Sequence, residues 1–298
     1  MAKTTLIEEL GRRTLLCDGA MGTQLFARGL PPDHAGILWN VERPEVLVDI
    51  HTAYCNAGCD LVTTNTFQGT TTALALHGLS ARARELNVAA ARNARAAAGD
   101  GRWVLADAGP FGGFLEPVGD VTEGQAVAVF AEQFAALREG GADAALVETM
   151  SDPAEVAAGV KAAKSVAGWP VIATYAFERG DGTAFRTMMG TTAADAVQAA
   201  IAAGADVVGA NCGTSLSLED YVRLAEDLLA AAGSTPVIVQ PNAGSPVEVD
   251  GKTVHPAMPA EMAELARKLR GLGVKIVGGC CGTSPAHLAA MGEAKPQA

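Results

Sequence analysis

Short apolar runs alternate with amphipathic segments along the whole chain. The runs are three or four residues long and apolar on both faces, which is typical of strands in a buried parallel sheet. Because helix start and stop signals separate them, each run is expected to be followed by a helix. The predicted strands cover residues 15–17, 60–63, 103–106, 144–147, 170–173, 206–209, 236–239 and 274–277.

The segments between the predicted strands carry recognisable helix boundaries. Asp152-Pro153-Ala154-Glu155 combines an N-cap, a first-turn proline and a glutamate that can bond back to the cap. Ser80 is expected to cap an alanine-rich helix that ends at Gly99. Further starts are predicted at Thr122 with Gln125, Thr192 with Asp195 and Ser217 with Asp220, and further ends at Gly58, Gly141, Gly204, Gly233 and Gly273.

This alternation predicts the fold class. Eight strand–helix units in 298 residues match the size of a single (β/α)8 barrel, the TIM barrel of the α/β class. An open, doubly wound parallel sheet is the alternative, since it shows the same alternation. No proline-rich linker, block of like charges or low-complexity tract divides the sequence. We therefore expect residues 1–298 to form one domain.

Polar residues stand at the points where the predicted strands end. In a barrel the carboxyl ends of the strands meet on one face, and that face carries the active site. The strand-end residues are therefore expected to lie together, and they are Asp18, Thr63, Thr64, Asn65, Thr66, Asp107, Glu148, Tyr175, Asn211, Gln240, Asn242 and Cys280.

The composition limits the classes of partner and compartment. A net charge of −11 and an isoelectric point near 4.9 argue against binding to nucleic acid or to an anionic membrane. The first residues lack the apolar stretch of a signal peptide, and no run of about 18 apolar residues occurs. Six cysteines in a chain of this length make a poor disulfide framework. We expect a cytoplasmic enzyme with reduced thiols.

The cysteines carry the strongest chemical signal. Cys280 and Cys281 are adjacent in a glycine-rich loop after the last predicted strand. Adjacent cysteines close only a strained disulfide ring, so a shared metal ion accounts for them better. Cys212, at the end of the sixth predicted strand, offers a third thiolate. Zn²⁺ held by three thiolates keeps its fourth tetrahedral position open for chemistry.

A thiol-bearing substrate suits that open position. Zinc coordination removes the proton of a thiol at neutral pH, whereas a free thiol with a pKa of about 8.5 is mostly protonated. The bound thiolate stays nucleophilic toward an activated methyl group, so the site predicts thiol alkylation. Two alternatives remain open: a closed structural site completed by His255 or His287, and a buried Cys212 that is unrelated to the adjacent pair.

The cysteines belong to a set of motifs that extends along most of the chain. With these motifs the chain resembles the zinc-dependent homocysteine S-methyltransferase family, which includes betaine–homocysteine methyltransferase and the N-terminal module of cobalamin-dependent methionine synthase. The resemblance implies a TIM barrel, a Zn²⁺ ion on Cys212, Cys280 and Cys281, and methylation of homocysteine to methionine. The motifs are Asp18-Gly19-Ala20-Met21-Gly22-Thr23, Thr64-Asn65-Thr66-Phe67, Glu148-Thr149, Gly209-Ala210-Asn211-Cys212, Gln240-Pro241-Asn242-Ala243-Gly244 and Gly278-Gly279-Cys280-Cys281-Gly282-Thr283.

The resemblance also implies how homocysteine is held. The substrate-binding positions of the family correspond to Asp18, Gly19, Thr64 and Glu148. Two carboxylates can hold the α-ammonium group, while backbone N–H groups and a hydroxyl hold the carboxylate. Asn211 is expected at the same site, where its amide orients the neighbouring thiolate. The alternatives are a helix cap or salt bridge for Asp18 and for Glu148, and simple packing for Thr64.

The methyl donor is less constrained than the acceptor. The residues after Cys212 depart from the methionine synthase pattern, and residues 178–190 carry an unusual Met188-Met189 pair where a donor would approach. The sequence lacks the Asp-x-His-x-x-Gly signature of a cobalamin-binding module. The donor is therefore expected to be a small onium compound or a methyl-corrinoid on a separate protein. The motif residues resemble the methionine synthase module more than the betaine enzyme, which favours the corrinoid.

Two other functions compete with methyl transfer. A barrel lyase or aldolase with a structural zinc would use Asp18 or Glu148 as a base, but it leaves three clustered cysteines without a role. A non-catalytic zinc- or thiol-binding protein would have a closed, four-ligand site. Cys17, Cys55 and Cys59 are expected to be buried packing residues rather than ligands.

Overall fold

A computed structural model describes residues 4–166, 168–180, 184–249 and 251–294. Eight parallel strands form one sheet in the order β1-β12-β9-β8-β5-β4-β3-β2. All eight predicted strands are confirmed. Their bounds are β1 Leu15–Leu16, β2 Leu61–Thr63, β3 Trp103–Ala108, β4 Ala144–Met150, β5 Val171–Tyr175, β8 Val207–Asn211, β9 Val237–Gln240 and β12 Ile276–Val277.

Contacts between β1 and β2 close the sheet into a barrel. Cys17 and Leu61 form a parallel bridge just beyond the end of β1. The N–H of Asp60 donates to the carbonyl of Leu16 at 2.7 Å, and the N–H of Asp18 donates to the carbonyl of Leu61 at 3.0 Å. The fold is therefore the expected (β/α)8 barrel and not an open sheet.

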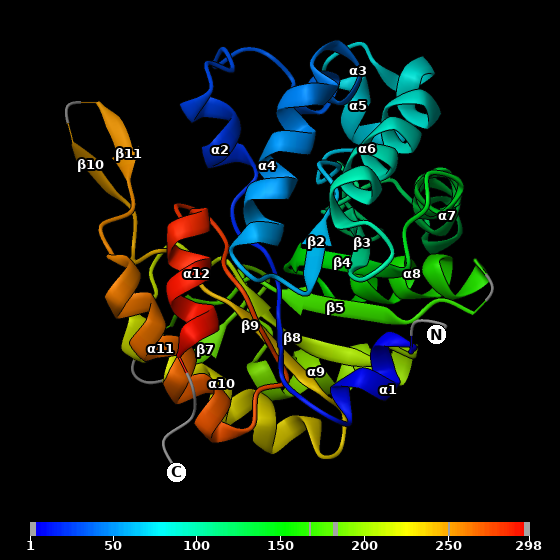
Figure 1. Ribbon diagram of the computed structural model, residues 1–298. Helices are drawn as coiled ribbons and strands as arrows, with labels where there is room; N and C mark the ends of the chain where they lie inside the picture. Colours follow the sequence, from blue (N-terminus) through cyan, green and yellow to red (C-terminus); the bar gives the residue numbers. More distant parts are fainter. Residues whose placement is uncertain (1–3, 167, 181–183, 250, 295–298) are drawn as a thin grey trace.

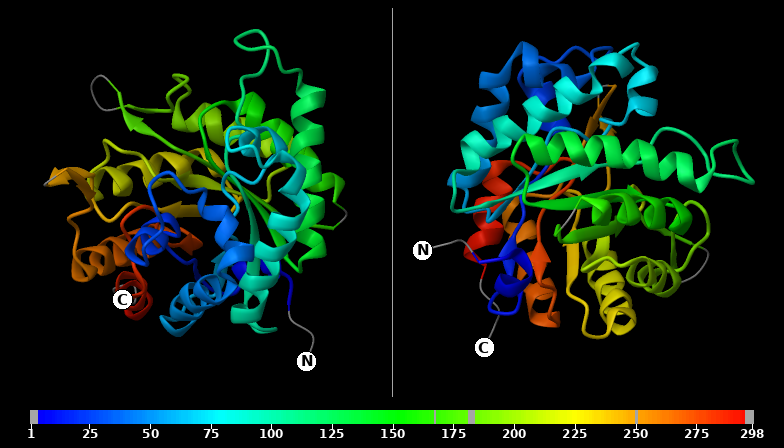
Figure 2. Two further views of the ribbon diagram at one scale, coloured as in Figure 1. Left: turned by 90° about the horizontal axis from the view of Figure 1, so that it is seen from above. Right: turned by 90° about the vertical axis from the view of Figure 1, so that its right-hand side faces the viewer.

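Helices surround the strands, as the two views in Figure 2 show. The short helix α1 (Leu6–Leu10) precedes β1, and the loops above the barrel contain α2 (Gly22–Ala27), α3 (Trp39–Glu42), α5 (Thr71–Ala75) and the 3-10 turns η1 (Gly36–Leu38) and η2 (Ser80–Arg82). The outer helices, labelled in Figure 1, are α4 (Pro44–Asn56), α6 (Ala83–Ala98), α7 (Glu123–Glu139), α8 (Pro153–Ser165), α9 (Ala193–Ala203), α10 (Leu218–Ala232), α11 (Pro259–Leu272) and α12 (Pro285–Glu293).

Most of the predicted helix boundaries are confirmed. The side chains of Thr122, Thr192 and Ser217 each accept the backbone N–H three residues further on, so they cap α7, α9 and α10. Glycines also end the helices as expected: Gly99, Gly204, Gly233 and Gly273 are the C-caps of α6, α9, α10 and α11, and Gly58 and Gly141 follow α4 and α7.

Two predicted capping interactions are wrong. Ser80 lies in η2 rather than at the start of α6, and its hydroxyl donates to the carbonyl of Thr71 at 2.8 Å. Asp152 caps α8, but Glu155 does not bond back to it. The Glu155 carboxylate accepts the N–H of Phe111 at 2.7 Å instead. A buried backbone N–H needs an acceptor. The N–H that Glu155 accepts belongs to Phe111, which is distant in the sequence.

The barrel interior is apolar at one end and polar at the other. Further along the strands, the inward-facing positions become Asp107, Glu148, Thr174, Asn211 and Gln240. Cys17, Cys55 and Cys59 are buried, as expected. The apolar layers consist of Leu15, Cys17, Leu61, Trp103, Leu105, Ala144, Leu146, Ile172, Val207, Ile238 and Ile276, which pack with Leu6 and Leu10 of α1.

Two small hairpins that the sequence pattern did not predict extend the loops after β5 and β9. One pairs β6 (Glu178–Arg179) with β7 (Phe185–Arg186), and the other pairs β10 (Val247–Val249) with β11 (Lys252–Val254). The first falls within residues 178–190, of which 181–183 lie outside the described residues. Met188 and Met189 follow this hairpin and are exposed.

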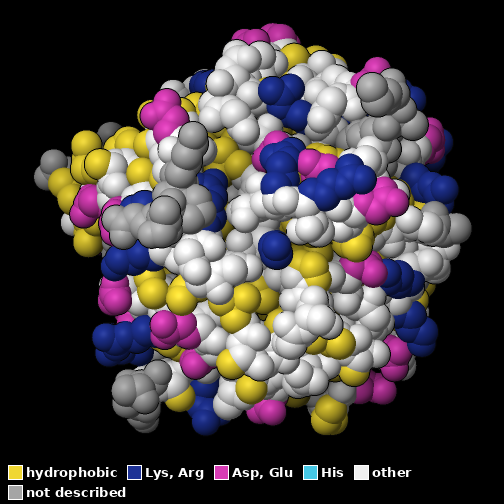
Figure 3. Space-filling model, turned by 60° about the horizontal axis from the view of Figure 1, so that its bottom comes forward, with side chains coloured by type: hydrophobic (Ala, Val, Ile, Leu, Met, Phe, Trp, Pro, Cys, Tyr) yellow, Lys and Arg dark blue, Asp and Glu magenta, His cyan; other side chains and the backbone are white. Residues whose placement is uncertain are grey.

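The outer surface carries mixed charges. On the lower side of the molecule, acidic and basic side chains are interspersed with apolar ones (Figure 3). Among the helices of the described residues, none is long and apolar enough to cross a membrane.

Tight packing between β8 and β9 gives a test of the barrel. A Cβ atom at Gly209 would lie 1.8 Å from the carbonyl oxygen of Ile238 on the neighbouring strand. We expect Gly209→Ala to lower the free energy of unfolding by about 2 kcal/mol or more, because backbone must move to relieve the contact. Urea-induced unfolding followed by circular dichroism measures the change.

Gly271→Ala is the matched control. Gly271 lies in α11, its Cβ would meet nothing within 4 Å, and its φ is not positive. The variant should be unchanged or stabilised by up to about 1 kcal/mol, because alanine favours the helix. Equal unfolding midpoints for the two variants would contradict the close approach of β8 and β9.

Candidate metal centre at the barrel mouth

A cavity of about 590 Å³ opens at the carboxyl ends of the strands. Loops after β1 and β2 form one wall, and the strand ends and the cysteine loops form the rest. The predicted site residues that line it are Gly19, Thr64, Glu148, Cys212, Cys280 and Cys281. The barrel therefore brings together six residues that are dispersed over most of the sequence.

Three sulfur atoms converge at this cavity. The Sγ atoms of Cys212, Cys280 and Cys281 all lie within 4.8 Å of one another. Tetrahedral zinc with Zn–S bonds of about 2.3 Å needs sulfur atoms about 4 Å apart, so the three thiols fit such an ion. The alternative in which Cys212 is unrelated to the adjacent pair is therefore wrong, and the three residues form a candidate metal centre.

The backbone around Cys212 is strained. Cys212 has a φ of 57°, a left-handed conformation that costs a residue with a side chain about 1–3 kcal/mol. The hydroxyl of Tyr221 on α10 donates to the Cys212 carbonyl and accepts the N–H of Asn242 at 3.3 Å. Asn242 Nδ2 donates to the carbonyl of Gly213 at 3.0 Å. This network stabilises the turn that aims the Cys212 sulfur at the other two.

The adjacent pair depends on glycines for its turn. A Cβ atom at Gly279 would lie 2.4 Å from Oγ1 of Thr283. Gly282 has a φ of 78°, and a Cβ atom there would lie 2.2 Å from Cβ of His255. Only glycine fits these two positions of the loop that directs both sulfur atoms to one point.

The thiols influence one another's protonation. Hydrogen bonds from Cys280 and Cys281 lower the pKa of Cys212 to about 3. The same contact with Cys212 raises the pKa of Cys281 to about 11 and that of Cys280 well above its ordinary value. One thiolate therefore shares the protons of its two neighbours. A metal ion takes the place of such protons, so we expect metal binding to release them.

No histidine joins the three sulfur atoms in the cluster formed by the described residues. His287 makes hydrogen bonds through both ring nitrogens, to Ser284 at 2.8 Å and to the carbonyl of Ala257 at 2.9 Å. His255 Nδ1 bonds to the carbonyl of Gly244 at 3.0 Å. The geometry therefore favours three protein ligands over a closed site.

Asn211 connects the thiols to the carboxyl group of Glu148. Its Nδ2 donates to Glu148 at 3.0 Å and lies 3.9 Å from the sulfur of Cys280. Its Oδ1 accepts from Thr149 N and from Thr174 Oγ1, which fixes the amide. The thiol that Asn211 touches is thus that of Cys280 rather than that of its sequence neighbour. Burial raises the pKa of Glu148 to about 7.

Thr64 lines the cavity, whereas Asp18 lies behind Thr63, which also lines it. The carboxylate of Asp18 accepts the N–H of Thr63 at 2.8 Å and its hydroxyl at 3.0 Å, and burial raises the pKa of Asp18 to about 7. Asp18 therefore caps no helix, and it is not among the residues that line the cavity. Thr64 lines the cavity, and its hydroxyl bonds to Thr66 and to the N–H of Asp107.

Asp107 lines the cavity, as expected from its place among the strand-end residues. Two further residues of the site were not singled out from the sequence: Thr149, which lines the cavity, and Tyr221, whose hydroxyl donates to the Cys212 carbonyl. Thr149 has a φ of 61° and lies where the register between β4 and β5 shifts, between Val147 and Met150.

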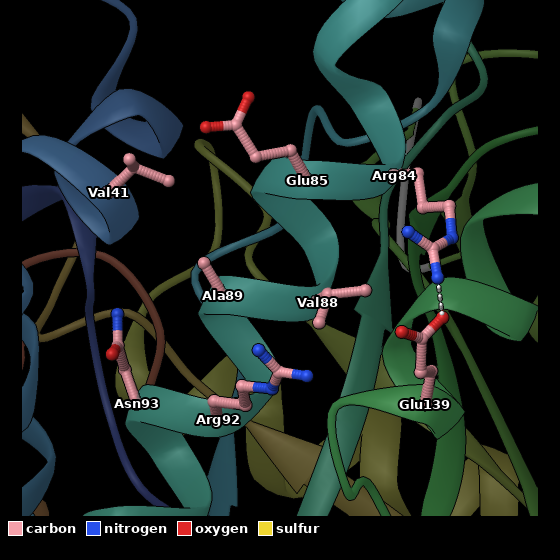
Figure 4. Close-up of a pocket in the computed structure, with 8 residues that line it drawn as sticks. All are labelled: Val41, Arg84, Glu85, Val88, Ala89, Arg92, Asn93 and Glu139. Carbon is pink, nitrogen blue, oxygen red and sulfur yellow. Dashed lines mark hydrogen bonds and ion pairs between the residues drawn. The ribbon is translucent and has the colours of Figure 1, made fainter.

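A second hollow of about 460 Å³ lies on the outside of the barrel between α3, α6 and α7. Arg84 and Glu139 point toward each other and form an ion pair at 2.5 Å (Figure 4). Its lining contains neither cysteine nor histidine and consists of Val41, Arg84, Glu85, Val88, Ala89, Arg92, Asn93 and Glu139. The reactive side chains therefore concentrate at the barrel mouth.

The fold and the site together define a TIM barrel with three thiols clustered at its catalytic face. A comparison with known protein families identifies the family of this barrel. The family model described as homocysteine S-methyltransferase matches residues 15–295. The chain belongs to the homocysteine S-methyltransferase family.

Known proteins resemble this chain in sequence and in fold. Methionine synthase of Mycobacterium tuberculosis is 35% identical over 304 residues, which are 96% of this chain and 25% of that protein. The chain thus spans about a quarter of the length of the curated relatives that it matches. The oxidized form of the Escherichia coli homocysteine methyltransferase MmuM superposes with a TM-score of 0.76 at 25% identity over 97% of this chain and 99% of that one. Its metallated form has a TM-score of 0.76 at 24% identity over 96% and 98%.

The support of Cys212 by Tyr221 can be tested directly. Tyr221→Phe leaves the Cys212 carbonyl and the Asn242 N–H without the shared hydroxyl. We expect its affinity for Zn²⁺ or Co²⁺ to fall about 10-fold, as is typical when a group that orients a ligand is lost. Competition with a chromophoric chelator measures the affinity.

Tyr175→Phe is the matched control. The Tyr175 hydroxyl is buried and has no hydrogen-bond partner among the described residues. Its removal should leave metal affinity unchanged and stability equal or higher. A Tyr221→Phe variant that binds metal as tightly as Tyr175→Phe would show that the hydroxyl of Tyr221 does not position the ligand.

Proposed function

We propose that the chain holds Zn²⁺ on Cys212, Cys280 and Cys281 and methylates homocysteine to methionine. The observation that supports this function best is the cluster of three sulfur atoms, which no histidine joins among the residues that the structure describes, beside a cavity of about 590 Å³. When bound, the zinc ion keeps the substrate thiol deprotonated at neutral pH. Membership in the homocysteine S-methyltransferase family agrees with this substrate.

The residues of the cavity supply binding and orientation. In this proposal Glu148 accepts the α-ammonium group, with its carboxyl group held by Asn211. Gly19 and Thr64 face the substrate carboxylate from the opposite wall, and Asp18 fixes the start of that wall through Thr63. Holding both ends of the amino acid aligns its sulfur for in-line attack, which lowers the entropic part of the barrier.

The transfer itself is a displacement at carbon. The substrate sulfur forms a bond to the methyl carbon while the bond between that carbon and the donor breaks, and the electron pair leaves with the donor. The substrate thiol releases its proton to water when it binds, so no protein base is needed at the methyl group. A lyase with Asp18 or Glu148 as base is less well supported, because it gives the three thiols no role.

The methyl donor is proposed to be a methyl-corrinoid carried outside this chain. A small onium compound needs only the cavity, whereas a protein-bound corrinoid also needs a contact surface around it. The similarity to methionine synthase favours the corrinoid. Exposed apolar side chains surround the mouth on loops that follow the strands, and this apolar rim consists of Phe26, Phe67, Leu76, Phe114, Val118, Met188, Met189, Val247, Val249, Val254 and Met258.

X-ray absorption at the zinc edge tests the metal and the acceptor together. The wild type should bind one zinc ion with three protein sulfur atoms, and homocysteine should add a fourth sulfur. Cys281→Ser should lose one sulfur and much of its zinc, because a hydroxyl is a poor zinc ligand. Cys55→Ala is the control, since Cys55 is buried away from the cluster. A wild type whose zinc has four protein ligands and ignores homocysteine would refute the proposal.

A comparison of donors tests the second half of the proposal. Purified zinc-loaded protein is incubated with homocysteine and methylcobalamin, S-methylmethionine or betaine, and methionine is quantified. We expect methylcobalamin to give the highest rate and Cys281→Ser to give none. Turnover with S-methylmethionine or betaine and none with methylcobalamin would overturn the corrinoid assignment while leaving the acceptor assignment intact.

A further inference from the structure

The carboxyl group of Asp107 has no evident role in the fold. Asp107 stands near the end of β3, is 4% exposed and lines the cavity. Its Oδ1 atom has no hydrogen-bond partner among the described residues. Burial of a carboxyl oxygen without a donor is costly, and folded proteins rarely tolerate it unless a ligand supplies the donor.

The backbone holds this side chain in place. The N–H of Asp107 donates to Oγ1 of Thr64 at 3.0 Å. Its carbonyl accepts from Oγ1 of Thr66 at 2.7 Å and from Nε2 of Gln133 at 3.2 Å. These bonds fix the backbone of Asp107 at the cavity wall, and its side chain is almost fully buried there.

Glu148 faces the same space from the neighbouring strand. The side chains of Asp107 and Glu148 are within hydrogen-bonding reach of each other. Two buried carboxyl groups in contact repel as carboxylates, so the pair favours a cation with several N–H donors between its oxygens. An alkylammonium group has three such donors.

The thiol cluster lies one side chain away from this pair. Asn211 donates to Glu148 and lies 3.9 Å from the sulfur of Cys280. An ammonium group at the carboxyl pair and a thiol at the cluster therefore belong to one small molecule with a short carbon chain. The geometry matches an amino acid that ends in a thiol.

We propose that Asp107 is a second acceptor for the α-ammonium group of the thiol substrate and sets the preference for amino thiols over thiols without an amino group. This role rests on the proposed function. Asp107 Oδ1 gains in the complex the donor that it lacks in the protein alone. Glu148 and Asp107 then hold the ammonium group from two strands. The Asp18 carboxylate, in contrast, already accepts the N–H and the hydroxyl of Thr63.

Binding of two thiols to zinc-loaded protein tests this role. Homocysteine carries the α-ammonium group, and 4-sulfanylbutanoate has the same thiol and carboxylate without it. Isothermal titration calorimetry gives the Kd of each for wild type, Asp107→Asn, Asp107→Ser and Glu155→Gln. The Glu155 carboxyl group is also buried, but it bonds to Phe111 outside the cavity, which makes it the matched control.

We expect Asp107→Asn and Asp107→Ser to raise the Kd of homocysteine about 10-fold or more and the Kd of 4-sulfanylbutanoate less than about 2-fold. Glu155→Gln should change neither. Equal losses for both thiols would show a structural role for Asp107, and unchanged Kd values would show none; either result overturns the assignment. If wild-type protein binds 4-sulfanylbutanoate as tightly as homocysteine, the role of Asp107 fails alone. If it binds neither, the proposed function fails as well.

Discussion

Two backbone hydrogen bonds at the end of β9 hold the thiol cluster together. The carbonyl of Gln240 accepts the N–H of Cys212 at 3.2 Å, and the carbonyl of Pro241 accepts the N–H of Cys280 at 2.8 Å. Because β9 lies between β8 and β12, it neighbours both cysteine-bearing strands. The arrangement of the three sulfur atoms thus depends on the order of strands in the sheet.

One end of the barrel contributes to stability, whereas the other contains features that lower it. Its apolar layers pack fully buried residues, whereas its mouth buries the carboxyl groups of Asp18 and Asp107 and a left-handed Cys212. Burial raises the pKa of Asp18 to about 7, a sign that ionisation is opposed there. Such features lower stability, and they concentrate where ligands bind, as expected when function is selected over stability.

Local signals predicted the fold well but predicted long-range contacts poorly. The eight strands and most helix ends follow from apolar runs, caps and glycines, which act over a few residues. Ser80 and Glu155 were misassigned because Thr71 and Phe111, their partners, come from other segments. Likewise, no local pattern reveals that the backbone N–H and hydroxyl of Thr63 both donate to the Asp18 carboxylate.

The sequence by itself determined the barrel, the three cysteines as a candidate metal centre and the resemblance to a methyltransferase family. These properties depend on the period of apolar residues and on short motifs, and both are encoded locally. Only the tertiary structure decided that Asn211 contacts Cys280 and that both candidate histidines bond elsewhere. It also decided that Asp107 Oδ1 has no hydrogen-bond partner in the part of the chain that the structure describes. The directions of the side chains at the mouth and their hydrogen-bond partners depend on residues from separate strands that meet there. No single segment of the chain contains that information.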